Sequence, residues 1–292
     1  MALLGSLAAL GSSFTWAFAS VRYAQASRKI GSARVNLARA TIVAPTYLVL
    51  VLALHGWVLP PGPLSGQYAW LLLSVFCSYG FADALFFSAA RRVGVPTALS
   101  IASTYPLWAV MVGVVFRAEP LSAQRIAGIV LCVGGVIALI RLAPRSGEAQ
   151  TSNFAAGGVA LAGLTSVFWA GNSIAVKFGS SGLDPVQVNA LRYTFALIVL
   201  GAAVGATKPA AAEQVDWRLL VPAIVADGLL GSSLFVYGLN HSDLAIGATL
   251  TSLAPLISVP IAIFVGEERW NLARLSAVVL TVAGAIVLVT AA

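Results

Sequence analysis

Charged residues and histidines are scarce in this sequence. Only 9% of the 292 residues are charged, against about 25% in an ordinary soluble domain, and the two histidines, His55 and His241, lie far apart in the chain. No phosphate-binding loop and no metal-ligand spacing is present, which excludes an ATP-driven pump on this chain alone. We therefore expect no enzymatic activity, no cofactor and no metal site.

Cysteine is equally rare, and the charge that is present has a simple distribution. Cys77 and Cys132 both lie inside apolar stretches, where packing is a better explanation than a disulfide or a metal ligand. The net charge is +7, but the basic residues gather at the ends of apolar runs. This placement is typical of membrane-topology signals, so nucleic acid is not an expected partner.

Long hydrophobic runs are what the sequence has in abundance. Hydrophobic residues make up 59% of the chain, and successive runs of about 20 residues are each long enough to cross a bilayer as a helix. The first run begins at Ala2 with no basic stretch before it, so we interpret it as a membrane helix rather than a signal peptide. The chain is predicted to be an all-α polytopic membrane protein. Its ten expected spans are 3–23, 35–55, 68–89, 97–116, 122–141, 155–176, 187–206, 218–239, 246–265 and 271–291.

The sequence contains an internal repeat. VNLARA at 35–40 returns as VNALRY at 188–193, and residues 5–41 align with 158–194 without a gap, including identical Trp, Asn and Arg. A second register aligns STYPLWAV at 103–110 with SLAPLISV at 252–259. The polar stretch 143–153 separates the copies. We therefore expect an N-terminal five-helix repeat at 1–142, a linker at 143–153 and a C-terminal five-helix repeat at 154–292.

An odd number of helices per repeat determines the relative orientation of the two copies. Two five-helix units joined by a short linker must be inverted in the bilayer, an arrangement that many secondary transporters use, with the substrate near the midplane. With ten spans, 13 Lys and Arg residues lie on one side and four on the other. Because positive charge accumulates in the cytoplasm, both termini are predicted to lie outside.

The repeat carries motifs that resemble the EamA-type branch of the drug/metabolite transporter superfamily. The chain is most similar to the YddG-type amino-acid exporters of bacterial inner membranes, whose members usually keep both termini in the cytoplasm, unlike the orientation predicted from charge. The resemblance covers essentially the whole chain. The matching features are an aromatic-small pattern at 14–17 and 168–170, Arg39 and Arg192 near the start of each second helix, Pro106 and Pro255 in each fourth helix, and Glu119 and Glu268 at its end.

The resemblance implies a central cavity formed by the first, third and fourth helices of each half. These spans are also unusually rich in polar and aromatic residues. Asp83 and Asp227 stand out, because a carboxylate within a span is costly and normally faces a cavity or a partner; a helix–helix polar contact is the alternative for both. The expected substrate-contacting residues are Trp16, Ser20, Tyr79, Asp83, Tyr105, Trp108, Trp169, Asn172, Asp227, Tyr237 and Ser252.

A second set of residues is expected to act in gating rather than in contact with substrate. Pro106 and Pro255 each remove one helical hydrogen bond and favour a bend. Arg39, Arg192, Glu119 and Glu268 are interpreted as helix-end charges or as ion pairs that lock one gate.

The resemblance implies a multi-pass protein of a bacterial inner membrane that exports small metabolites. Amino acids, aromatic or otherwise neutral, are the expected substrates. Its expected partners are this substrate and the lipid bilayer, and a monomer is expected to be functional. A passive facilitator or channel for a small metabolite or drug is the alternative.

Overall fold

The computed structural model describes residues 2–56, 65–108, 122–142, 152–206, 215–242, 247, 250–264 and 271–290. Throughout these residues the regular structure is helical, with no strand. Six helices in this part of the chain are long and apolar enough to cross a membrane. They are Leu3–Ile30, Ser32–His55, Gly66–Val93, Ala155–Gly179, Pro185–Gly205 and Trp217–His241. The prediction of a helical, multi-pass membrane protein is confirmed.

The first part of the chain forms long helices, one of them with an internal change of geometry. Its third helix is interrupted by a π-helical segment, η1. The elements are α1 (Ala2–Ile30), α2 (Ser32–His55), α3 (Ser65–Val75), η1 (Phe76–Ala82), α4 (Asp83–Val93), α5 (Val95–Ala102) and α7 (Ala123–Leu142).

The later part of the chain follows the same order, including a second π-helical segment, η2, in its third helix. A fourth helix of about 20 residues, expected at 97–116 and again at 246–265, lies only partly within the described residues. The elements are α8 (Ser152–Gly179), α9 (Pro185–Gly205), α10 (Trp217–Val225), η2 (Ala226–Gly231), α11 (Ser232–His241), α13 (Ala254–Phe264) and α14 (Leu272–Thr290).

The first helix is longer than the sequence predicts. Its expected end was at residue 23, but α1 continues to Ile30 and α2 begins directly afterwards at Ser32. Residues 24–30 contain neither glycine nor proline, so nothing interrupts the helix until Gly31, whose φ of +83° ends it. The turn between the two helices is therefore a single residue instead of a loop of eleven.

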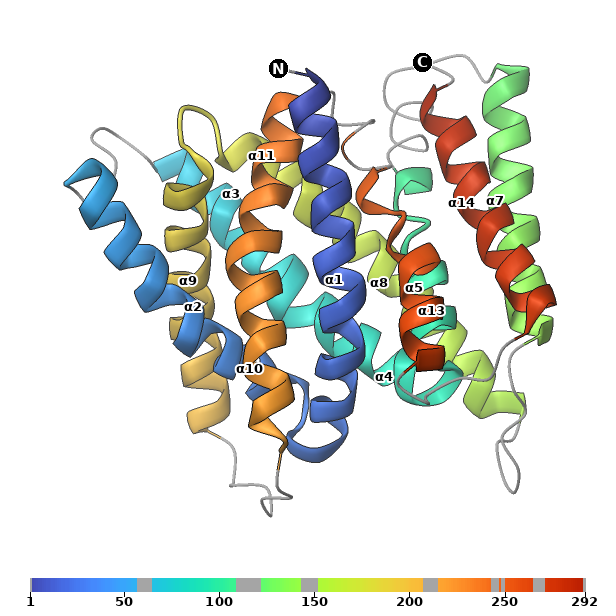
Figure 1. The fold of residues 1–292 in the computed structure, drawn as a ribbon, viewed down its shortest axis with the longest axis horizontal. Coiled ribbons are helices and arrows are strands. Elements are labelled where there is room, and N and C mark those ends of the chain that lie inside the picture. Colours follow the sequence, from blue (N-terminus) through green and yellow to red (C-terminus); the bar gives the residue numbers. More distant parts are fainter. Residues whose placement is uncertain are drawn as a thin grey trace.

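Helices from the two parts of the chain pack against each other in reciprocal pairs. Figure 1 shows α2 beside α9 on one flank of the bundle and α7 beside α14 on the other. In between, α1 packs on α11 while α8 packs on α4. The marked N- and C-terminal ends of the chain lie at the same end of the bundle (Figure 1). The arrangement brings the first and third helices of both parts together at the centre.

The N-terminus of α9 is stabilised by a helix cap that also contacts the end of α2. Asp184 accepts hydrogen bonds from the backbone N–H groups of Val186 and Gln187, and the Gln187 side chain accepts one from the Asp184 backbone N–H, which completes a capping box. The other Asp184 carboxylate oxygen lies 2.6 Å from Nε2 of His55 at the end of α2.

Replacing Asp184 with alanine is expected to lower the free energy of unfolding by about 0.5–2 kcal/mol, the usual value of an N-cap. Asp184→Asn keeps the cap acceptor but removes the charge. It should cost much less, because the His55 pair is about one-third exposed and surface pairs contribute about 0–1 kcal/mol. Denaturation in detergent micelles measures both variants. Equal losses would mean that the ion pair, not the cap, stabilises this corner.

Candidate functional site: a charged cavity between the two halves

A cavity lies at the centre of the bundle, with walls contributed by both parts of the chain. It holds about 750 Å³ of space not occupied by atoms, counting the portion continuous with the exterior. The lining is mainly hydroxyl, amide and aromatic side chains with four charged groups among them. The lining residues are Ser12, Ser13, Trp16, Arg39, Ser78, Tyr79, Asp83, Ser103, Tyr105, Trp169, Asn172, Ser173, Arg192, Asp227, Gly231, Ser232, Phe235 and Thr251.

Two repeat-related tryptophans meet at this cavity. Trp16 of α1 and Trp169 of α8 occupy equivalent positions in the sequence repeat, and their rings lie edge to face with centroids 5.7 Å apart. Phe86 of α4 contacts both, with centroids 5.9 Å from Trp16 and 5.5 Å from Trp169. The aromatic wall is therefore built from the central helices of both halves and offers an apolar surface to a bound solute.

Arg39 of α2 holds both intramembrane carboxylates of the cavity. Its Nη1 lies 2.7 Å from Oδ2 of Asp83, and its Nη2 lies 2.9 Å from Oδ2 of Asp227. All three residues are buried, with 3–6% of their surface exposed. The same Nη1 also donates to Oδ1 of Asn36, whose amide nitrogen donates to the carbonyl of Tyr79. Each charge in this triad thus has a specific partner, as burial in a membrane requires.

Aromatic rings surround the Arg39 guanidinium. Its Cζ lies 4.4 Å from the ring centroid of Tyr23, 5.2 Å from that of Tyr79 and 5.7 Å from that of Trp16. Its Nε is buried without a hydrogen-bond acceptor. The electron-rich faces of these rings stabilise the cation where a conventional acceptor is missing.

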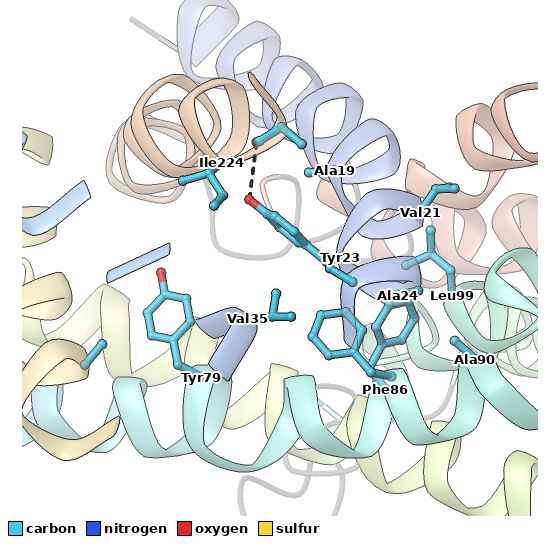
Figure 2. Close-up of a cluster of buried hydrophobic side chains, with 14 of the residues drawn as sticks. Ala19, Val21, Tyr23, Ala24, Val35, Tyr79, Phe86, Ala90, Leu99 and Ile224 are labelled. Atoms are coloured by element: carbon cyan, nitrogen blue, oxygen red, sulfur yellow. Dashed lines mark hydrogen bonds between the residues drawn. The ribbon is translucent and has the colours of Figure 1, made fainter. Parts of the chain in front are cut away.

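Tyr23 is a site residue that the sequence analysis missed. Its hydroxyl lies 3.3 Å from Oδ2 of Asp227 and 3.2 Å from the carbonyl oxygen of Ala223, the bond drawn as a dashed line in Figure 2. Figure 2 also shows Tyr23 within the buried cluster that contains Val35 and Phe86. No local signal marks it, because its role depends on the approach of α10 and η2 to the far end of α1.

Arg192 of α9, the repeat counterpart of Arg39, has a different environment. Its Nε donates to Oγ of Ser74 at 3.0 Å, its Nη2 to Oδ1 of Asn172 at 3.0 Å, and its Nη1 to Oδ1 of Asn189 at 3.5 Å. All of these acceptors are neutral. Within the described residues no carboxylate pairs with Arg192, although it is only 3% exposed.

The positions of the two arginines differ from the sequence expectation in one respect. They were expected near helix starts, but Arg39 lies well inside Ser32–His55 and Arg192 well inside Pro185–Gly205. Both helices begin two or three residues earlier than expected, at Ser32 and Pro185, which places each arginine about two turns into its helix. Both guanidiniums therefore lie in the helical interior of the bundle and line the cavity.

Breaks in the fourth helix of each half contribute further to the wall. α5 ends at Ala102 and a turn follows at 103–105, so that Pro106 begins a new helical stretch. In the second half a turn at 252–253 precedes α13, in which Pro255 is the second residue. The hydroxyl of Tyr105 from the first break contacts that of Thr251 beside the second, which joins the two halves across the cavity.

Most of the expected substrate-contacting residues line the cavity together. The seven that do so are Trp16, Tyr79, Asp83, Tyr105, Trp169, Asn172 and Asp227. Asp83 and Asp227 do not align in the repeat, yet both form an ion pair with Arg39. Each of them therefore lines the cavity and also has a charged partner. Phe235 and Gly231 also line the cavity, and nothing in their local sequence distinguishes them from packing residues.

Four of the expected contacts do not line the cavity. Ser20 is fully buried and donates to the carbonyl of Ala17, the usual behaviour of a helical serine. Trp108 donates its indole N–H to Oγ of Ser166. Tyr237 stacks on His241 with ring centroids 4.0 Å apart, and Ser252 is buried in the turn before α13. Glu119 and Glu268 lie outside the described residues.

Long apolar helices around a buried polar cavity with charged groups define a membrane protein that handles small solutes. Comparison with known proteins assigns it further. The model of the EamA-like transporter family matches residues 3–141 and again 156–290, so the chain belongs to that family. This match confirms the resemblance to the EamA-type branch. Members of this family are membrane transporters of small molecules rather than enzymes.

Structural comparison supports the fold alone. One crystal structure matches with a TM-score of 0.71 and 17% sequence identity, covering 98% of this chain and 96% of that chain. No curated protein matches the sequence.

Proposed function

We propose that the protein is a secondary transporter that exports small metabolites, most prominently amino acids, from a bacterial cytoplasm across the inner membrane. The observation that carries the proposal is the cavity itself, in which a tryptophan wall faces buried groups of both charges. An amino acid presents the matching combination of an ammonium group, a carboxylate and a side chain. A monomer contains the whole cavity, so we further propose that one chain suffices.

We also propose that the fold is ten helices in two inverted repeats, 1–142 and 154–292 around the linker 143–153. Three features support this organisation. The same family model matches each half, a π-helical segment occurs in each third helix, and the central contacts are exchanged, α1 with α11 and α8 with α4. Such exchanged packing is what two interlocking copies related by a two-fold axis would produce. The proposed orientation keeps both termini outside, as the Lys and Arg count predicts.

Alternating access is the mechanism that this arrangement favours. In each fourth helix, residues next to the break at the proline line the cavity. Such breaks are where transporter helices bend. Rocking of the halves against each other would separate Tyr105 from Thr251 and open the wall. Pro106 and Pro255 would then act as hinges.

One observation favours a passive facilitator as the second candidate. Proton coupling needs a carboxylate that can exchange a proton during the cycle, but Asp83 and Asp227 are both bonded to Arg39. If this triad stays intact throughout the cycle, the protein moves its solute only down a gradient.

Uptake of radiolabelled amino acids into proteoliposomes, with and without an imposed pH gradient, tests the proposal. Wild type should show saturable transport, and accumulation driven by the gradient should be lost in Asp227→Asn. Asp216→Asn is the matched control, because Asp216 is an exposed cap at the start of α10 and asparagine can cap equally well. Downhill transport indifferent to the gradient would establish the facilitator. No transport of any amino acid would refute the proposed substrate class.

A further inference from the structure

The two repeat-related arginines of the cavity differ in the number of carboxylates that pair with them. Arg39 has two carboxylate partners, Asp83 and Asp227, and Arg192 has none within the described residues. With the carboxylates ionised, the Arg39 triad has one excess negative charge and Arg192 has one uncompensated positive charge. The four groups together are neutral, but the cavity wall is dipolar.

The hydrogen-bond inventory of Arg192 shows that it has donors to spare. A guanidinium has five N–H donors, one on Nε and two on each terminal nitrogen. Nε, Nη1 and Nη2 of Arg192 each donate once, to Ser74, Asn189 and Asn172. One N–H on each terminal nitrogen therefore has no acceptor in the part of the chain that the structure describes. A pair of N–H groups on the two terminal nitrogens is the fork that binds a carboxylate with two hydrogen bonds.

The neutral partners also hold this guanidinium in place. Ser74 comes from α3, Asn172 from α8 and Asn189 from α9 itself, so three helices orient it. The charge is buried, and an isolated buried charge is costly unless a partner arrives. A ligand anion would supply that partner without displacing any existing ion pair.

Arg39 and Arg192 share one aromatic neighbour, Tyr79. The Cζ of Arg192 lies 5.6 Å from the ring centroid of Tyr79, and the Cζ of Arg39 lies 5.2 Å from the same centroid. Both arginines and both carboxylates also line the same cavity, so a solute with separated charges meets groups of both signs there. A neutral zwitterion fits without adding net charge to a buried site, whereas a simple anion or cation would add one.

We infer that Arg192 is the carboxylate subsite of the cavity, and that the substrate binds as a zwitterion with its ammonium group toward the Asp83–Asp227 side. The inference rests on the proposed function, because it specifies how the amino-acid substrate is held. It also assigns different roles to the two arginines that occupy equivalent positions in the repeat. Arg39 stabilises the protein's own carboxylates and Arg192 receives that of the solute.

Ligand binding to the purified protein in detergent tests the inference, with tryptophan fluorescence as the signal because Trp16 and Trp169 line the cavity. The probes are leucine, phenylalanine, threonine and lysine, each compared with its carboxamide, which has nearly the same size but no negative charge. Wild type should prefer the acid by about 10- to 100-fold, the usual range for a hydrogen-bonded charged group. This comparison requires no mutation.

Variants then assign the preference to one residue. Arg192→Gln should weaken binding of the acid by the same factor and leave binding of the amide unchanged, while Arg192→Lys should retain part of the preference. Arg91→Gln is the control, because Arg91 is an exposed arginine on α4 outside the cavity. Gel filtration and thermal unfolding establish that each variant is folded.

The possible failures are distinguishable. If wild type binds acid and amide equally, the carboxylate subsite is refuted and the proposed transport of amino acids stands. If the acid preference survives in Arg192→Gln, another group holds the carboxylate. If wild type binds none of the four amino acids, the inference and the proposed substrate class fail together.

Discussion

Replacing Arg39 with glutamine is expected to lower the free energy of unfolding by about 3–5 kcal/mol, the range seen when one partner of a buried ion pair is removed. The physical reason is that Asp83 and Asp227 would remain buried near each other without the cation that both contact. Unfolding of the purified protein in detergent, by heat or denaturant, measures the loss.

Two comparisons make this result interpretable. Arg192→Gln removes an arginine at the equivalent repeat position, but its partners are neutral, so the loss should be clearly smaller. Combining Arg39→Gln with Asp83→Asn and Asp227→Asn should recover much of the stability, because no uncompensated charge is then left. Equal losses for the two arginine variants would show that the ionic contacts of Arg39 contribute nothing special.

Adding a single methyl group to Gly135 is expected to separate α7 from α14. A Cβ at Gly135 would lie 2.6 Å from the backbone nitrogen of Thr281 and 2.9 Å from the carbonyl oxygen of Ala277, closer than packed atoms allow. The side-chain Oγ1 of Thr281 also obstructs this position, but because the other two atoms belong to backbone, the helices must move apart. We expect Gly135→Ala to cost about 1–3 kcal/mol, as overpacking usually does.

The neighbouring glycine supplies the control. A Cβ at Gly134 meets no atom within 4 Å, so Gly134→Ala should be neutral or stabilising by about 0.5–1 kcal/mol through helix propensity alone. Thermal unfolding of both variants should thus give opposite signs. Destabilisation of the same size at both positions would mean that helix flexibility, not the contact with α14, requires glycine here.

Features that depend on local pattern could be predicted from the sequence. Apolar runs identified the long helices, and the repeat register identified Trp16 and Trp169, which meet at the cavity. The second register, which aligns 103–110 with 252–259, also pairs Gly135 with Gly284. Both glycines lie in the contact between α7 and α14, and a Cβ at Gly284 would lie 2.8 Å from the carbonyl oxygen of Gly128. Small residues at helix interfaces are the expected means of close approach in membranes.

Features that depend on which helices pack together in three dimensions could not be predicted from the sequence. Asp83 and Asp227 occupy unrelated repeat positions, so only the packing of both third helices around α2 reveals that they share Arg39. Ser20 resembles the other hydroxyl residues of its span, yet it faces its own helix backbone. Periodicity locates a residue on a helix but does not determine which neighbour that helix meets.

The π-helical segments also have a consequence for how the charged groups are positioned along the chain. A π turn contains one residue more than the α turn it replaces, so it acts as an insertion that is absorbed without breaking the helix. Everything after Phe76–Ala82, beginning with Asp83, is rotated by about 100° from where an uninterrupted α-helix would place it. The direction in which Asp83 points from α4, and therefore its contact with Arg39, thus depends on the number of residues in the π-helical segment as well as on their identity. In this helix a one-residue deletion would be a larger change than most substitutions.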